Sequence, residues 1–83
     1  MRDRVTCEIV EHLGTFAEYT DFRGEKKTKE INLVSWNGKM PKVDIREWDE
    51  EHSRPTKGLT LTDEEAESVA TILHNYISER RTK

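Results

Sequence analysis

Two tryptophans and an arginine give this sequence its most distinctive chemistry. Residues 42–48 alternate in character, so that Arg46 and Trp48 point to one side of a predicted strand and its apolar residues point to the other. Trp36 lies just before the turn that leads into this strand. An indole ring beside a guanidinium group can hold a flat, negatively charged partner, such as a nucleic acid base with its phosphate.

A β-hairpin is predicted to position these side chains. Asn37-Gly38 is a tight-turn signal, because both residues tolerate positive φ angles. Strands are expected over residues 29–36 and 42–48, joined by a loop over residues 37–41. Pro41 lies in that loop, where no ladder hydrogen bond is required of it.

The chain before the hairpin is also predicted to be extended. Residues 5–20 alternate in character, and Gly14 interrupts the run, which indicates either one long bent strand or two short strands. Residues 21–28 form a polar, charged connection. They are interpreted either as a solvated loop or as a basic arm beside the binding face.

A short strand over residues 56–61 and a helix over residues 63–79 complete the chain. Thr62 and Glu65 have the spacing of a capping box, which marks the start of a helix. Apolar residues follow at helical spacing: Ala66, Val69, Ala70, Leu73, Tyr76 and Ile77.

This order of elements predicts an α+β fold in which one domain spans residues 1–83. Four antiparallel strands are followed by one C-terminal helix. The helix is expected to cover the apolar face of the sheet and to leave the face of Trp36, Arg46 and Trp48 open. The covered residues would be Ile31, Leu33, Val43, Ile45, Leu59 and Leu61.

The composition favours a small protein that dimerises. Of 83 residues, 33% are hydrophobic and 37% are charged, which leaves a thin core for a lone monomer. The net charge is −3, but residues 23–57 hold nine basic against seven acidic side chains, so a basic patch is still expected. The sequence has a single cysteine, Cys7, and neither a signal peptide nor a membrane span. These features predict a cytoplasmic protein, which could associate with the nucleoid, and no membrane partner.

The titratable side chains indicate no enzyme. His12, His52 and His74 have no metal-ligand spacing, so neither a metal nor another cofactor is expected. The sequence contains no defensible catalytic triad or Gly-rich phosphate loop.

Three segments in order resemble a known family. They are Trp36-Asn37-Gly38-Lys39, Val43-Asp44-Ile45-Arg46-Glu47-Trp48, and Lys57-Gly58-Leu59-Thr60-Leu61-Thr62 with the acidic helix start. Together they resemble the single-stranded-DNA-binding domain of the transcriptional coactivator positive cofactor four, in its short bacterial form. The similarity covers about half of the chain, from Glu30 to Leu73.

The resemblance implies a curved ββββα subunit and a homodimer joined through its helices and the neighbouring sheet edge. The helix residues that would meet the partner are Val69, Leu73, Tyr76 and Ile77. It also implies a concave sheet surface that binds unpaired strands. The implied contacts are base stacking by Trp36 and Trp48, backbone contacts from Lys39 and Arg46, and a basic rim at Lys57 and Arg54. Lys26, Lys27 and Lys29 are added as basic residues of the preceding segment.

Two departures from the family pattern remove basic residues near Trp36. Val34 and Asn37 stand where the family often has basic side chains. Structural alternatives also stay open: each tryptophan could pack under a loop or at a dimer seam, and Arg46 could form an ion pair within the sheet.

The function predicted is sequence-tolerant binding of single-stranded DNA by a homodimer, in transcription, replication or repair. RNA remains open as a ligand. The alternative is a transcription-cofactor subunit that uses the same face to dock a protein, such as part of the transcription machinery.

Overall fold

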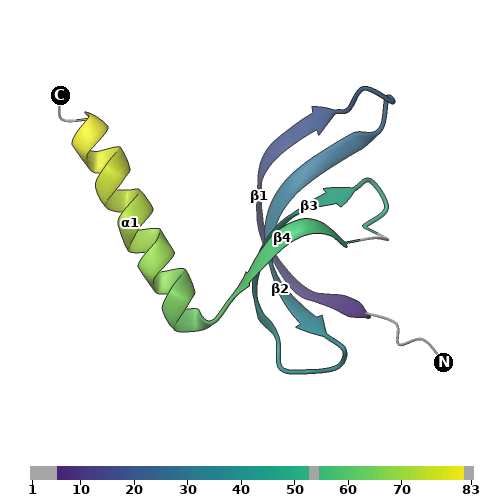
Figure 1. The fold of residues 1–83 in the computed structure, drawn as a ribbon, viewed down its shortest axis with the longest axis horizontal. Coiled ribbons are helices and arrows are strands. Elements are labelled where there is room, and N and C mark those ends of the chain that lie inside the picture. Colours follow the sequence, from purple (N-terminus) through teal and green to yellow (C-terminus); the bar gives the residue numbers. More distant parts are fainter. Residues whose placement is uncertain (1–5, 53–54, 82–83) are drawn as a thin grey trace.

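Four strands and one helix make up the fold in the computed structural model, which describes residues 6–52 and 55–81 (Figure 1). The strands are β1 (Cys7–Thr20), β2 (Lys26–Trp36), β3 (Lys42–Asp49) and β4 (Pro55–Leu61), and the helix is α1 (Asp63–Arg81). The strands lie in the order β1-β2-β3-β4, and every neighbouring pair is antiparallel. The predicted fold class is confirmed.

The turn between β2 and β3 forms where the sequence predicts it. Asn37 and Gly38 both have positive φ angles, 54° and 74°, and the Lys39 amide donates to the Trp36 carbonyl at 3.0 Å. Positive φ angles at both central residues are typical of a tight turn, which here lies within the longer connection over residues 37–41.

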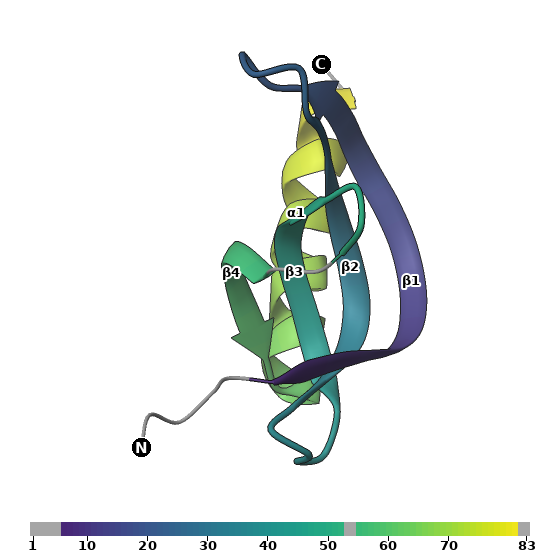
Figure 2. The ribbon, with the colours of Figure 1, turned by 90° about the vertical axis from the view of Figure 1, so that its right-hand side faces the viewer.

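β1 is one long strand, which settles the choice between one bent strand and two short ones. Its pairing with β2 shifts register three times, between Ile9 and Glu11, between His12 and Gly14, and between Thr15 and Ala17. Bulges of this kind bend a strand and increase its twist. Figure 2 shows the result, since the N-terminal part of β1 bends sharply and crosses the ends of the other strands.

β2 begins earlier than predicted, because Lys26, Lys27 and Thr28 belong to the strand and not to a loop. Residue Asp21 makes the short connection possible. One of its carboxylate oxygens accepts hydrogen bonds from the amides of Arg23 and Glu25, both at 2.9 Å. Both bonds lower the pKa of Asp21, and the bond from the Glu25 amide has the larger effect. Lys26, Lys27 and Thr28 can therefore pair with β1, and Lys27 and Thr28 also pair with β3.

The helix starts at the predicted capping box and runs two residues further than expected, to Arg81. The Thr62 amide donates to the Glu65 carboxylate at 2.9 Å, and the Glu65 amide donates to the Thr62 hydroxyl at 3.1 Å. The helix is not apolar enough to be a membrane span, and no other helix exists within the described ranges.

The prediction that the helix covers the sheet is wrong. Figure 1 shows α1 projecting away from the strands, and none of its residues is buried. Only Thr62 separates Leu61, the last residue of β4, from the first residue of the helix. So short a link leaves no length for the helix to fold back over its own sheet.

Most of the buried side chains lie on the concave face, which was expected to be open. Val34 and Trp48 are fully buried there. Leu61 is also nearly buried, at 6% exposed, but it lies on the outer face. Glu30, Asn32 and Asp44 are buried too. The curvature explains this reversal, because a curled sheet encloses its inner face while its outer face spreads open. Leu59, on the outer face, is 56% exposed.

Candidate nucleic-acid interface

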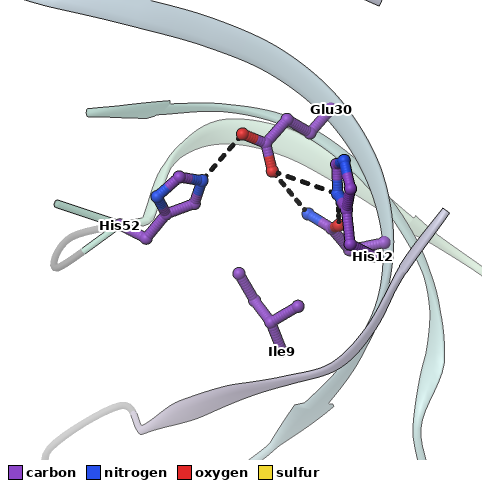
Figure 3. Close-up of a pocket in the computed structure, with 5 residues that line it drawn as sticks. Ile9, His12, Glu30 and His52 are labelled. Atoms are coloured by element: carbon purple, nitrogen blue, oxygen red, sulfur yellow. Dashed lines mark hydrogen bonds and ion pairs between the residues drawn. The ribbon is translucent and has the colours of Figure 1, made fainter. Parts of the chain in front are cut away.

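A polar hollow lies at the centre of the concave face. It has a volume of about 240 Å³ and is lined by Ile9, His12, Glu30, Asn32 and His52. Figure 3 shows these side chains meeting from β1, from β2 and from the segment after β3. The site therefore unites residues that are far apart in the sequence, and none of them was predicted as a site residue.

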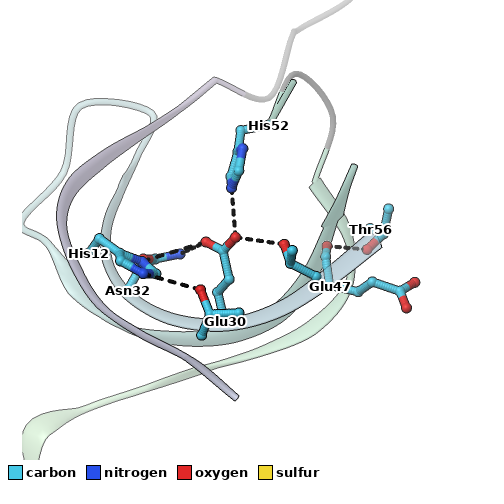
Figure 4. Close-up of polar contacts among 8 residues, drawn as sticks. His12, Glu30, Asn32, Glu47, His52 and Thr56 are labelled. Carbon is cyan, nitrogen blue, oxygen red and sulfur yellow. Dashed lines mark hydrogen bonds and ion pairs between the residues drawn. The ribbon is translucent and has the colours of Figure 1, made fainter. Parts of the chain in front are cut away.

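Glu30 holds this hollow together (Figure 4). One carboxylate oxygen accepts from the Thr28 hydroxyl at 2.6 Å and from His52 Nε2 at 2.7 Å. The other accepts from the Asn32 amide at 3.1 Å and lies 3.6 Å from His12 Nδ1. His12 Nδ1 also lies 2.6 Å from the Asn32 oxygen. A buried carboxylate is stable only when it is hydrogen-bonded in this way.

The hydrogen bonds set the acidity of Glu30. Burial alone would raise the pKa of this carboxyl, but the bonds from Thr28, Asn32 and His52 outweigh burial and lower the pKa below its ordinary value of 4.5. The carboxylate is therefore ionised at neutral pH. It accepts hydrogen bonds and does not donate them.

We expect this depressed pKa to make the fold acid-sensitive. The folded state binds the Glu30 proton more weakly than the unfolded chain, so the stabilisation is complete above the ordinary pKa of 4.5. It is lost as the pH falls through the lower, folded-state pKa, at about 1.4 kcal/mol for each unit of depression.

Urea unfolding at a series of acidic pH values measures this effect. Glu30→Gln should flatten the fall of the unfolding free energy below about pH 4.5. Glu50→Gln, at an exposed position, is the matched control and should keep the wild-type slope. An unchanged slope in Glu30→Gln would contradict the assignment.

Arg46 is fixed within the sheet. Its Nε and Nη2 atoms donate to the two oxygens of buried Asp44, at 2.7 and 2.9 Å, and its Nη1 donates to the Thr56 carbonyl. Its guanidinium carbon lies 4.8 Å from the centre of the Trp36 ring. The side chain is only 11% exposed. The ion pair considered as the structural alternative is thus present, and it leaves Arg46 with little surface for a phosphate.

Gly58 makes room for this arginine. A Cβ atom at Gly58 would lie 2.2 Å from the Cβ and 2.7 Å from the Cζ of Arg46, which is too close for any side chain. The Arg46 side chain therefore packs against β4 at Gly58, and this packing requires a glycine in the Lys57-Gly58 motif.

We expect Gly58→Ala to displace Arg46 and to destabilise the fold by about 1–3 kcal/mol, the usual cost of overpacking. Urea unfolding measures the change. Gly14→Ala is the matched control, because a Cβ atom at Gly14 would meet nothing within 4 Å and its φ is not positive. Equal unfolding free energies for the two variants would contradict this role of Gly58.

Trp36 lies half-buried at the end of β2, with Arg46 over its ring. Its indole nitrogen is buried and has no hydrogen-bond partner in the described part of the chain. Lys39 is exposed in the adjacent turn, and Lys42 is exposed on the same face of β3. The structure therefore places Arg46 against Trp36, with Lys39 in the adjacent turn.

Trp48 is not open on the surface, and this expectation is wrong. Its side chain is fully buried, and the His52 ring stacks on it with centroids 5.5 Å apart. This is the structural alternative of a tryptophan packed under a loop, since His52 belongs to the segment that follows β3.

The remaining basic residues separate into two groups. Lys26 lies an even number of residues before Trp36 on β2, so both point to the concave side. Lys27 and Lys29 point to the convex side. Lys29 and Lys57 line a second hollow with Phe16 and Ile45, on that convex side. A strand bound in the concave face would not reach these lysines directly. Arg54 lies outside the described residues.

The two departures from the family pattern have structural explanations. Val34 is fully buried and pairs with Ile9 of β1, so this position belongs to the core and not to a phosphate-binding surface. The Asn37 side chain accepts a hydrogen bond from the Thr6 amide at 2.9 Å. It anchors the chain just before β1 to the turn.

The sequence carries a partial signal for the polar hollow. Glu30, Asn32 and Val34 alternate on one face of β2, and Glu30 and Asn32 line the hollow instead of facing solvent. His12 and His52, which have no metal-ligand spacing, both lie beside Glu30. No cluster of three potential metal ligands occurs among residues 6–52 and 55–81.

Comparison with known proteins gives two findings. The family model described as Transcriptional Coactivator p15 (PC4) matches residues 18–72, which is more than half of the chain and includes Trp36, Arg46, Trp48 and Gly58. An "Uncharacterized protein" of Treponema pallidum (strain Nichols) is 32% identical over 75 residues, which cover 90% of this chain and 84% of that protein. The match over residues 18–72 shows that the chain belongs to the Transcriptional Coactivator p15 (PC4) family.

Proposed function

We propose that this protein binds single-stranded nucleic acid, DNA foremost, on the concave face of its sheet. The observation that carries the proposal is the stack of Trp36 and Arg46 beside the β2–β3 turn, with ring and guanidinium 4.8 Å apart, in a chain of this family. An indole held in place by a cation loses little freedom when a base stacks on its open side.

The charges of the concave face support an anionic ligand. Its two buried carboxylates have internal partners, because Asp44 is paired with Arg46 and Glu30 accepts several hydrogen bonds. Lys26, Lys39 and Lys42 are exposed around the same face. A phosphate backbone bound on the concave face would meet these three lysines.

We further propose that two copies of the chain form the working unit. The helix exposes Leu73, Tyr76 and Ile77 by 53%, 55% and 46%, and the convex face exposes Leu59 by 56%. Val69 lies half-buried on the same side of the helix. A second copy could cover both apolar surfaces, which a soluble monomer rarely leaves open.

The role proposed is that of a cytoplasmic binding protein in transcription, replication or repair, and not of an enzyme. Fluorescence polarisation with labelled oligo-dT, and with a duplex of the same length, tests it. We expect much tighter binding of the single strand and a salt slope of about −2 to −3, as for three or four phosphate contacts.

Equal, weak binding of the single strand and the duplex would contradict the proposal. No binding at low salt, together with a protein partner whose capture is lost in Trp36→Ala, would favour the alternative of a protein-docking subunit.

A further inference from the structure

His52 covers one face of the buried Trp48. The rings of His52 and Trp48 stack at 5.5 Å with an angle of 28° between their planes. Trp48 is fully buried, whereas His52 is exposed. The imidazole therefore lies between the indole and the solvent on the concave face.

The backbone of His52 has an unfavourable conformation. Its φ angle is +56°, a region that residues other than glycine rarely adopt. The His52 amide donates to the Asp49 carbonyl at 3.1 Å, and its Nε2 lies 2.7 Å from Glu30 Oε2. Conformations of this kind persist where surrounding contacts enforce them, and they are concentrated at ligand-binding sites and switches.

The indole beneath His52 is left incompletely satisfied. Trp48 Nε1 is buried and has no hydrogen-bond partner in the described part of the chain. A buried donor without an acceptor is disfavoured. His52 thus covers the ring without completing its hydrogen bonding.

The contacts of His52 are those of a nucleobase. It is a flat aromatic ring, it stacks on an indole, and its ring N–H donates to an ionised carboxylate, since Glu30 can only accept. We propose that His52 occupies a base-binding position on Trp48, and that a base with a ring N–H displaces it and donates to Glu30. This inference rests on the proposed function.

The chemistry of Glu30 predicts which bases fit. Thymine and uracil carry a ring N–H at N3, and guanine carries one at N1, so each can replace the His52 donor. Cytosine and adenine have no ring N–H at the corresponding position. Their exocyclic amines can donate to one carboxylate oxygen, but the ring acceptor beside each amine would face the carboxylate unfavourably. The site should therefore favour thymine over cytosine, two pyrimidines of similar size.

Polarisation titrations with oligo-dT and oligo-dC test the inference. The wild-type protein should bind oligo-dT at least about threefold more tightly than oligo-dC, the value of one hydrogen bond. His52→Ala removes the competing ring and should raise the affinity for oligo-dT about three- to tenfold, as expected when a closed site is opened. His52→Phe keeps a stacking ring that cannot donate to Glu30, and should not show this gain.

The exposure of Trp48 gives an independent readout. The sequence has two tryptophans, so a Trp36→Phe background leaves Trp48 as the single indole fluorophore. In that background, His52→Ala should increase quenching by acrylamide, and oligo-dT should then protect the indole.

The outcomes separate the two proposals. If the wild-type protein binds neither oligonucleotide, the proposed function fails. If it binds both equally, and His52→Ala changes neither the affinity nor the quenching of Trp48, the proposed function stands and the inference about His52 is overturned.

Discussion

Trp36→Ala is expected to weaken the binding of oligo-dT by about 5- to 160-fold, because stacking of one base on an aromatic ring contributes about 1–3 kcal/mol. The loss should affect all base sequences similarly, since every base has a face that can stack. Fluorescence polarisation at constant salt measures it. Trp36→Phe keeps a ring and should recover part of the affinity.

Phe22→Ala is the matched control for this prediction. Phe22 is 92% exposed in the β1–β2 connection, outside the concave face. Its removal deletes an accessible aromatic ring without touching the Trp36–Arg46 stack, so the affinity should stay at the wild-type level. If the two alanine variants bind equally well, Trp36 is not the stacking residue. Thermal unfolding of each variant excludes a loss of fold as the cause.

Leu73→Glu is expected to have the largest effect on assembly. Leu73 lies at the centre of the apolar side of α1, close to Val69, Tyr76 and Ile77 on the helix surface. A carboxylate there would be buried without a partner in the proposed dimer, which costs several kcal/mol. Light scattering after size exclusion should show a shift from twice the chain mass of 9.8 kDa to the chain mass itself.

Asn75→Glu is the control for the dimer prediction. It introduces the same charge on the opposite side of the same helix. It should leave the mass and the unfolding transition as in the wild-type protein. If Leu73→Glu also leaves both unchanged, the apolar side of α1 does not hold the copies together.

Elements governed by local interactions could be predicted from the sequence. The Asn37-Gly38 turn and the Thr62–Glu65 capping box depend on residues within four positions of one another, and both occur as expected. The strands follow from the alternation of side chains. Only their ends differ, by up to three residues at Lys26.

The choice between the two faces of the sheet could not be predicted in this way. Alternation shows that one face is apolar and the other polar, but not which face curls inward. The three register shifts in β1 set the curvature, and the single-residue link at Thr62 directs the helix away. The apolar face therefore stays open in one copy, and the polar face is buried.

The candidate site shows the same division. Lys39 lies in the turn just after Trp36, so their proximity follows from the hairpin. Arg46 pairs with Glu30 and not with a residue next to Trp36, so its contact with the Trp36 ring does not follow from the strand register. The contacts of Glu30 with His12 and His52 join three distant segments, so no sequence spacing reveals them. The burial of Trp48 beneath His52 likewise depends on how one particular loop packs.

The central claim, that nucleic acid binds to the concave face, is tested most directly by NMR titration of the isotope-labelled protein with oligo-dT. We predict that the signals of Asn32, Lys42 and the indole N–H of Trp36 shift on binding, while those of Leu59 and Tyr76 do not. Shifts confined to the convex face and α1, with the Trp36 signal unchanged, would contradict the account.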